Sequence, residues 1–265
     1  MLIFGFVCSI LIGISLGLIG SGGSILMMPV LVYLFLVNPV TATTYSLFIV
    51  GFTAGIGSIN YFRKGLVNLY IALIFGIPSV LSVFFTRAFL LPSIPSVVFT
   101  LGNYAVSKAT FLMLIFAVLM IFAALSILIS GFKQKSEELN QPHLNYPLII
   151  FLGALEGSLT GLVGVGGGFL IIPILVLLTK LPIKSAVGTS LIIIASKSVI
   201  GFIVKVNSDF VDWFLIAQII IFTLIGLFIG IYLSKKTDGL KLKPLFAWFL
   251  LILGLYIIIK ETFIK

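Results

Sequence analysis

The stretch Gly17–Pro29 reads GLIGSGGSILMMP, and the stretch Gly161–Pro173 repeats it with small changes as GLVGVGGGFLIIP. The two copies lie 144 residues apart, and each sets several glycines inside a strongly apolar part of the chain. Glycine weakens a continuous helix because its backbone loses the most conformational freedom on folding. Two glycine-rich breaks at matching positions therefore indicate how this fold is organised.

The composition around these breaks is that of a membrane protein. The chain has 265 residues, of which 61% are hydrophobic and 9% charged, and its mean hydropathy is +1.34. Soluble domains carry about 25% charged residues. Apolar runs near the length that crosses a bilayer core, about 20 residues, recur from end to end. We predict an all-α polytopic membrane protein with no separate soluble domain, and we expect its apolar start to be a retained helix rather than a signal peptide.

Residue counts exclude several classes of function. The basic residues lie between apolar runs, as in loops that face anionic lipid, so the net charge of +9 does not indicate a nucleic-acid partner. One cysteine, Cys8, and one histidine, His143, cannot form an internal disulfide, a thiolate metal cage or a paired-histidine site. A membrane enzyme would need a nucleophile with its base, or clustered carboxylates. We predict no enzyme activity, no metal and no cofactor.

Beyond the breaks, the two halves match at the same offset. Gly20, Gly22, Gly23 and Pro29 fall on Gly164, Gly166, Gly167 and Pro173, while Ala42 and Ser46 fall on Ala186 and Ser190. Coincidences at one fixed offset over three consecutive segments indicate a duplication. We predict a first transmembrane repeat at 1–130, a linker loop at 131–145 and a second repeat at 146–265.

Each repeat is expected to hold a glycine-broken helical hairpin followed by three transmembrane helices. The second segments of the two halves are too short to span the bilayer and are interpreted as half-helices. The stretch 91–108 has no full counterpart and is expected at the membrane interface. The apolar segments are 2–20, 24–37, 41–62, 67–90 and 109–130 in the first half, and 146–164, 169–179, 185–204, 213–234 and 244–260 in the second.

The basic residues favour an inverted relation between the repeats. If each broken hairpin goes in and comes back, one side of the membrane collects most of the loop cations: Arg63, Lys64, Lys133, Lys135, Lys180, Lys184, Lys235, Lys236, Lys241 and Lys243. If each hairpin were one continuous crossing, the cations would divide almost evenly. The positive-inside rule prefers the first arrangement, with both termini outside.

The breaks themselves predict an anion site. Bare backbone amides are not tolerated in lipid, so such a break must be buried in protein or line a wet cavity. We expect half-helices to begin at about Ser24 and about Gly168, with their unpaired N–H groups near the membrane midplane. The residues expected at this site are Ser21, Gly22, Gly23, Ser24, Gly166, Gly167 and Gly168. The alternative interpretation is close helix packing, which suits Gly13, Gly17, Gly157 and Gly161 better.

Polar residues on the following helices complete the predicted site. Ser46 and Thr53 share one helical face, and the matching segment carries Thr189, Ser190 and Lys197. A lysine this deep in an apolar segment must face a partner or water. Lys197 either supplies positive charge to an anionic substrate or forms a structural ion pair with Glu156. The two roles are compatible if Glu156 exchanges Lys197 with substrate, or carries a coupling proton.

The doubled glycine motif, AVGTSL at 186–191 and the pattern G-x-V-[ND] resemble the TauE/SafE sulfite exporter family, also called the toluene sulfonate uptake permease family. The resemblance covers nearly the whole chain. It implies a bacterial or archaeal inner-membrane permease for small sulfur-containing or organic anions, driven by the proton gradient. The matching motif positions are Gly20, Gly22, Gly23, Gly164, Gly166, Gly167 and Gly168, with Ser46, Thr189 and Ser190. Ser24, the segment TATTYSL at 41–47 and Lys197 depart from the family pattern.

Taken together, the sequence predicts a secondary transporter that moves small anions such as sulfite or sulfonates by alternating access. Its expected partners are a small anionic substrate, protons, the lipid bilayer and, in one option, further copies of the chain. A passive anion channel and a non-transporting scaffold or assembly factor are the alternatives. A channel would conduct without coupling, and a scaffold would show neither flux nor stabilisation by a ligand.

Overall fold

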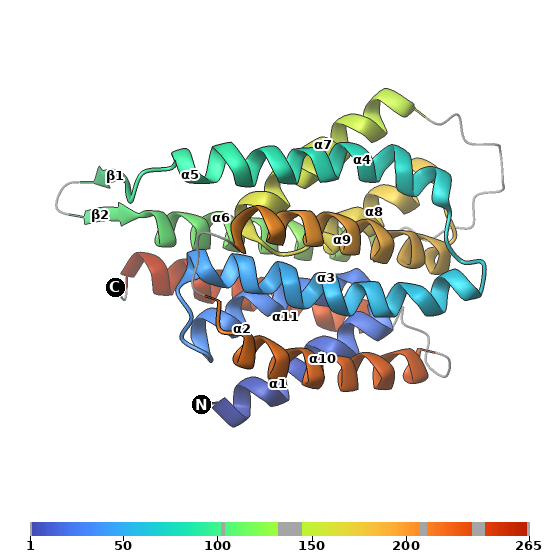
Figure 1. The fold of residues 1–265 in the computed structure, drawn as a ribbon, viewed down its shortest axis with the longest axis horizontal. Coiled ribbons are helices and arrows are strands. Elements are labelled where there is room, and N and C mark those ends of the chain that lie inside the picture. Colours follow the sequence, from blue (N-terminus) through green and yellow to red (C-terminus); the bar gives the residue numbers. More distant parts are fainter. Residues whose placement is uncertain (1, 102–103, 132–144, 207–210, 235–241, 264–265) are drawn as a thin grey trace.

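The computed structural model describes residues 2–101, 104–131, 145–206, 211–234 and 242–263. The side chains of Ser21 and Phe169 lie outside this description, as does nearly all of the predicted linker loop with His143. The helices run side by side in an elongated bundle (Figure 1). Within the described residues, seven helices are long and apolar enough to cross a membrane. The predicted polytopic helical architecture is confirmed.

The element bounds follow the predicted segments closely. The first half contains α1 (Leu2–Ile19), the 3-10 helix η1 (Ser21–Leu26), α2 (Met27–Tyr33), α3 (Pro39–Arg63), α4 (Leu69–Phe85), the π-helical turn η2 (Thr86–Leu90), α5 (Leu91–Ser93), the strands β1 (Val97–Leu101) and β2 (Tyr104–Ser107), and α6 (Lys108–Gly131). The second half contains α7 (Tyr146–Val163), α8 (Gly168–Thr179), α9 (Ile183–Val206), α10 (Trp213–Leu233) and α11 (Leu242–Phe263).

Short polar side chains fix where four of the long helices begin. Asn38, Asn68, Asn145 and Asp212 each accept a hydrogen bond from a backbone N–H in the first turn of the following helix. An amide or carboxylate oxygen at this position satisfies a donor that has no partner inside the helix. The polar residues between apolar runs therefore set the lengths of α3, α4, α7 and α10.

The stretch predicted to lie at the interface takes a different form. The helix that starts as α4 continues through η2 and α5 to Ser93, and the chain then forms an antiparallel hairpin that projects from the end of the bundle (Figure 1). Prolines at 92 and 95 end the helix, and the run VVFT at 97–100 is rich in residues that favour strands. This hairpin is the only β-structure among the described residues.

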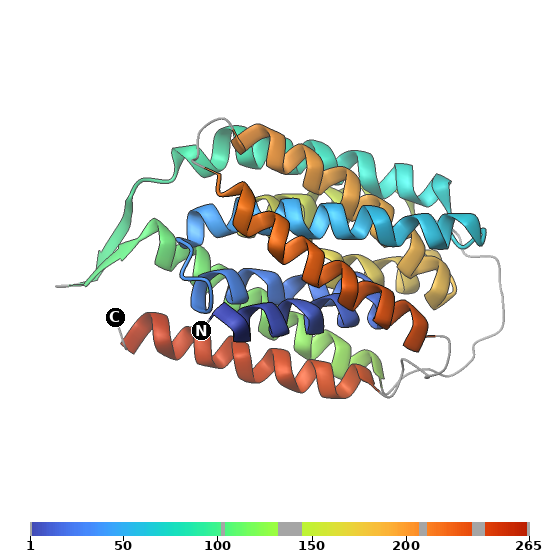
Figure 2. The same cartoon turned by 60° about the horizontal axis from the view of Figure 1, so that its bottom comes forward.

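The broken hairpins return to the end from which they start. Figures 1 and 2 show α1 and α3 beginning at the end with the β-hairpin, whereas α7 and α9 begin at the opposite end. Helices α3 and α9, which correspond in the repeat, pack antiparallel: Gly201 lies against Leu47, while Gly188 lies against Tyr61. The sidedness in a membrane stays a prediction, as does the division into repeats at 130 and 146.

Each of the main helix pairs joins a helix of one half to a helix of the other half. Helix α1 packs along α10, and its counterpart α7 packs along α4, while α6 pairs with α11. Gly13 faces the Thr223 carbonyl, and Gly157, 144 residues later, faces the Ser79 carbonyl, 144 residues before Thr223. The absence of a side chain lets the backbones of each pair approach closely. The packing interpretation of these glycines is confirmed.

Gly157→Ala is expected to force α7 away from α4, because a Cβ would lie 2.8 Å from the Ser79 Cα and closer still to its carbonyl oxygen. Overpacking against rigid backbone costs about 1–3 kcal/mol. The matched control is Gly55→Ala, whose Cβ would lie 3.8 Å from the Ala195 Cβ, an ordinary contact. Thermal unfolding in detergent should show a clearly lower unfolding temperature for Gly157→Ala and an unchanged one for Gly55→Ala. Equal unfolding temperatures would contradict this account of the α4–α7 contact.

Candidate functional site

The two glycine breaks come together inside the bundle. Helix η1 of the first break packs against α8 of the second, and both breaks contact the α3–α9 pair. Gly20 lies against Val187 of α9, and Gly164 lies against Thr43 of α3. Thr43 and Val187 are themselves separated by the repeat offset. Each break therefore packs onto a helix of the other half.

The first break differs from its prediction. Helix does not restart at about Ser24: the chain turns at Gly20, whose φ is +78°, and resumes at once as the 3-10 helix Ser21–Leu26. The Met27 N–H donates to the Ser24 carbonyl, so η1 runs directly into α2. Gly22, Gly23 and Ser24 are buried within this continuous helical stretch. The first half-helix therefore starts at Ser21, three residues before the predicted position, and its first turns are 3-10 rather than α-helical.

The second break forms the helix start that was predicted. Helix α7 ends at Val163, where the Gly164 N–H donates to the Thr160 carbonyl at 2.7 Å. Gly164, Gly166 and Gly167 all have φ between +65° and +75°, a region that side chains strongly disfavour. Helix α8 begins at Gly168 with Gly167 as its N-cap. The run of glycines lets the chain turn through left-handed conformations and restart as a helix, with its amino end facing inward.

A charged cluster lies at this amino end. Glu156 of α7 and Lys197 of α9 are both fully buried and form an ion pair. The Thr160 hydroxyl donates to the same Glu156 oxygen at 2.7 Å, and the Ser79 hydroxyl of α4 donates to the other oxygen at 2.9 Å. Lys197 Nζ also lies 3.3 Å from the Thr160 hydroxyl. The ion-pair interpretation is confirmed. Helix α4 adds a hydrogen-bond donor to the cluster, Ser79, that the sequence did not predict.

Gly167 is held directly against this cluster. A Cβ at this position would overlap Glu156 Oε1 and the Thr160 hydroxyl, and would lie 2.6 Å from Lys197 Nζ. The Glu156 carboxylate thus sits beside the amino end of α8, which carries the positive end of the helix macrodipole. An ammonium, two hydroxyls and a helix amino end surround a single carboxylate.

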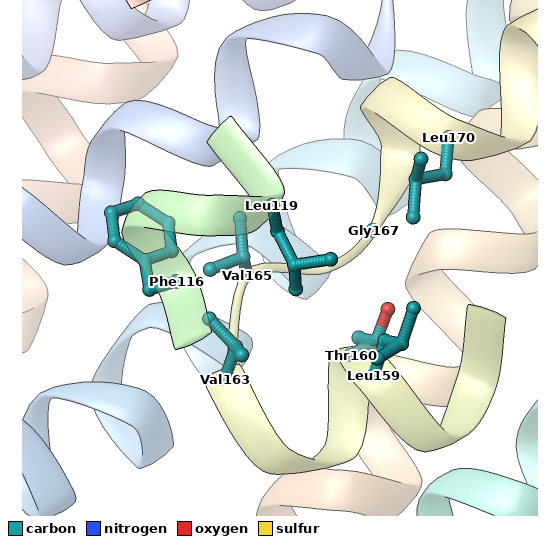
Figure 3. A pocket seen from close by; sticks show the side chains of 8 residues that line it. All are labelled: Phe116, Leu119, Leu159, Thr160, Val163, Val165, Gly167 and Leu170. Carbon is teal, nitrogen blue, oxygen red and sulfur yellow. The ribbon is translucent and has the colours of Figure 1, made fainter. Parts of the chain in front are cut away.

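A small cavity adjoins the cluster. It has a volume of about 10 Å³ and is lined by Thr160, Gly167 and apolar side chains that include Phe116, Leu119 and Leu170. Figure 3 shows the Thr160 oxygen on the side that faces Gly167 and Leu170. A cavity of about 10–15 Å³ holds one water. The wet, solute-sized space expected here is therefore not open in this conformation, and a larger ligand would have to displace protein groups.

Three of the predicted hydroxyls are engaged with backbone. Thr53 donates to the Ile49 carbonyl at 2.7 Å and Ser190 to the Val187 carbonyl at 2.8 Å, both within their own helices. Thr189 accepts a hydrogen bond from the Asn68 N–H at 3.0 Å. Thr53 and Ser190 thus use their single O–H donor on a backbone carbonyl and have none left for an anion, whereas the bond to Thr189 uses only an acceptor site of its hydroxyl.

Two buried serines behave differently. The hydroxyls of Ser46 and Ser198 have no hydrogen-bond partner among the described residues, although both side chains are fully buried. Ser46 lies one turn from Thr43 and one turn from Val50, which contact Gly164 and Gly166 respectively. Ser46 therefore lies on the α3 face that meets the second break, where a ligand would find a free hydroxyl.

Arg87 is a buried charge that was not included in the predicted site. It lies in η2 with no exposed surface, where Nε donates to the Gly161 carbonyl at 3.1 Å and Nη1 to the Thr44 hydroxyl at 3.2 Å. Arg87 lies three residues before the predicted end of its segment at residue 90. The helix continues to Ser93, which places Arg87 inside the bundle.

Comparison with known proteins identifies the family. Residues 5–257 match the family described as Sulfite exporter TauE/SafE. A "Probable membrane transporter protein" of Xylella fastidiosa (strain 9a5c) is 30% identical over 94% of this chain and 91% of its own length. The "Probable membrane transporter protein YdhB" of Bacillus subtilis (strain 168) is 29% identical over 88% of this chain and 90% of its own length. No solved structure gives a significant match.

Proposed function

We propose that this chain, a multi-pass cell-membrane transporter that belongs to the TauE/SafE sulfite exporter family, is a secondary transporter of small anions such as sulfite or sulfonates. The observation that carries the proposal is the environment of the Glu156 carboxylate. Lys197, Thr160, Ser79 and the amino end of α8 converge on one negatively charged group. The same set of donors suits the oxygens of a sulfite, sulfonate or carboxylate.

In this proposal Glu156 acts as an internal competitor of the substrate. Burial of an unpaired charge is strongly unfavourable, so Lys197 must keep a negative partner at every stage. When a substrate anion replaces Glu156 as the ion-pair partner of Lys197, the Glu156 carboxylate loses its counter-charge. It must then take up a proton to remain buried. One proton then enters the site with each anion, which gives proton coupling without a separate relay. The free hydroxyl of Ser46 would complete the substrate contacts from α3.

Alternating access would follow from movement of one repeat against the other around the α3–α9 pair. The small cavity beside Thr160 fits a state in which protein groups close the site. A passive channel gains no support from a site that is filled by an ion pair. A non-transporting scaffold would leave unexplained why Lys197 and Glu156 are buried at the start of α8.

The decisive experiment measures stabilisation by anions with purified protein in detergent. Methanesulfonate, sulfite, sulfate and acetate are added separately, and thermal unfolding is followed at about pH 5 and about pH 8. Methanesulfonate stays ionised throughout, so it reports the protein's own proton. We expect it to raise the unfolding temperature more at the lower pH, because proton uptake with the anion makes binding tighter as pH falls.

Two variants sharpen this test. Glu156→Gln removes the competing carboxylate, so added methanesulfonate should stabilise it strongly and equally at both pH values. The double variant Lys197→Met with Glu156→Gln removes both charges and should lose the response to the anion. If no anion stabilises the wild-type protein at either pH, or if the double variant responds like wild type, the proposed site is wrong.

A further inference from the structure

A second, much larger cavity, which is widely open at the surface, lies at the end of the bundle where the α3–α4 and α8–α9 turns meet. Its volume is about 380 Å³, and its lining residues are Gly65, Val67, Asn68, Leu69, Leu181 and Ser185. One water occupies about 30 Å³ of liquid volume, so this space admits a small oxyanion or sulfonate together with several waters. The two turns come from different halves of the chain.

The charged residues of the two turns that line this cavity all have one sign. Arg63 and Lys64 precede the lining residues of the first turn, and Lys180 and Lys184 flank those of the second. All four side chains are exposed, and neither turn, RKGLVN at 63–68 or KLPIKS at 180–185, contains an acidic residue. A cleft lined by one sign of charge concentrates counter-ions and raises their rate of association.

A direct contact links this cavity to the helix that carries Lys197. The Asn68 N–H, at the cavity wall, donates to the Thr189 hydroxyl of α9 at 3.0 Å. Lys197 lies eight residues further along the same helix, about 12 Å away at the helical rise of 1.5 Å per residue. The cavity therefore opens at the end of α9 that leads toward the charged cluster.

An equivalent hydrogen bond from a backbone N–H to a hydroxyl forms at the other end of the bundle, where the accepting side chain is larger than threonine. There the Asp212 N–H donates at 2.7 Å to the hydroxyl of Tyr45, which stands 144 residues before Thr189. The tyrosine is 4% exposed, so its ring fills the position that corresponds to the small threonine. The two ends of α3 and α9 are unequal in this conformation, and the cavity lies at the threonine end.

We propose that this cavity is an electrostatic vestibule that collects small anions before they enter the transport site. The proposal rests on the proposed function, since it describes how the anion reaches the site formed by Glu156 and Lys197. Lys180 and Lys184 are the residues that supply its positive potential from the α8–α9 turn. The charge distribution of the loops predicts that this end is the cytoplasmic one.

The test measures methanesulfonate uptake into proteoliposomes in which the proposed cytoplasmic end of the protein faces outward, so that the added anion meets the vestibule first. In the double variant Lys180→Gln with Lys184→Gln, we expect KM to rise about 5- to 10-fold at low ionic strength with the maximal rate unchanged, because steering acts on association. The rise should shrink as salt is added, since salt screens exposed charges. The matched control, Lys180→Arg with Lys184→Arg, keeps both charges and should retain the wild-type KM and salt dependence.

Orientation is measured in every sample by protease access to a terminal tag, because lysine removal can alter insertion. The vestibule is overturned if the glutamine variant, with its proposed cytoplasmic end facing outward, has an unchanged KM, or a lower maximal rate at unchanged KM. Uptake by the wild-type protein would in that case leave the proposed function intact. If the wild-type protein takes up none of the anions, the proposed function fails and the vestibule falls with it.

Discussion

Gly167→Ala is expected to abolish the native arrangement of the second break. The new Cβ would overlap Glu156 Oε1 and the Thr160 hydroxyl, so the ion pair with Lys197 would have to separate. The backbone also has a φ of +65°, which costs a residue with a side chain roughly 1–2 kcal/mol. Together with overpacking of about 1–3 kcal/mol, the loss of stability should reach about 2–5 kcal/mol. Denaturant unfolding in detergent measures this loss directly.

Gly65→Ala is the matched control for this substitution. Gly65 has nearly the same φ, +66°, but a Cβ there would meet nothing within 4 Å. The control therefore carries only the backbone cost, about 1–2 kcal/mol. If both variants lose the same stability, the close approach of Gly167 to the charged cluster has no energetic consequence, and the account of the site is wrong.

Lys197→Met is expected to destabilise the protein by about 3–5 kcal/mol, because it leaves the Glu156 carboxylate buried without its counter-charge. Glu156→Gln should cost a similar amount for the opposite reason, since the ammonium then lacks a negative partner. Substituting both residues removes both charges together, and we expect stability to recover to within about 1–2 kcal/mol of wild type. The unfolding free energies of the four proteins form a double-mutant cycle.

The cycle distinguishes an interacting pair from two independent residues. An interaction energy of roughly 2 kcal/mol or more is expected for groups that share a buried contact. Simple addition of the two single losses in the double variant would contradict the pair. Thr262→Ala, which alters an exposed side chain bonded only to its own helix, controls for unrelated effects on α-helical stability.

Much of the architecture could be predicted because it depends on local sequence. Apolar runs set the spans, and the polar caps Asn38, Asn68 and Asp212 set where helices begin. The fixed offset located both breaks, and the run of glycines at 166–168 correctly predicted a helix start at Gly168. The family was also recognisable, because its motifs are contiguous in the chain.

The site was predicted less completely, for reasons that particular residues make clear. Lys197 and Glu156 were singled out because any charge deep in an apolar run needs a partner. Ser79, an ordinary serine in an apolar helix, gave no comparable signal. Arg87 was not singled out, because it lies near the predicted end of its segment; the helix runs on to Ser93 and buries it. The first break was expected to resemble the second, but the chain there resumes as a 3-10 helix after a single turn at Gly20.

The sequence by itself determined that this chain is a membrane protein whose helices are interrupted at two points with matching glycine motifs, since hydropathy and glycine content act over short stretches. Only the tertiary structure decided which groups meet. Lys197 and Glu156 are 41 residues apart, and Ser79 is 77 residues from Glu156, so their convergence depends on how α4, α7 and α9 pack. The size of each cavity was likewise set by packing, because the side chains that fill or leave a space come from different helices.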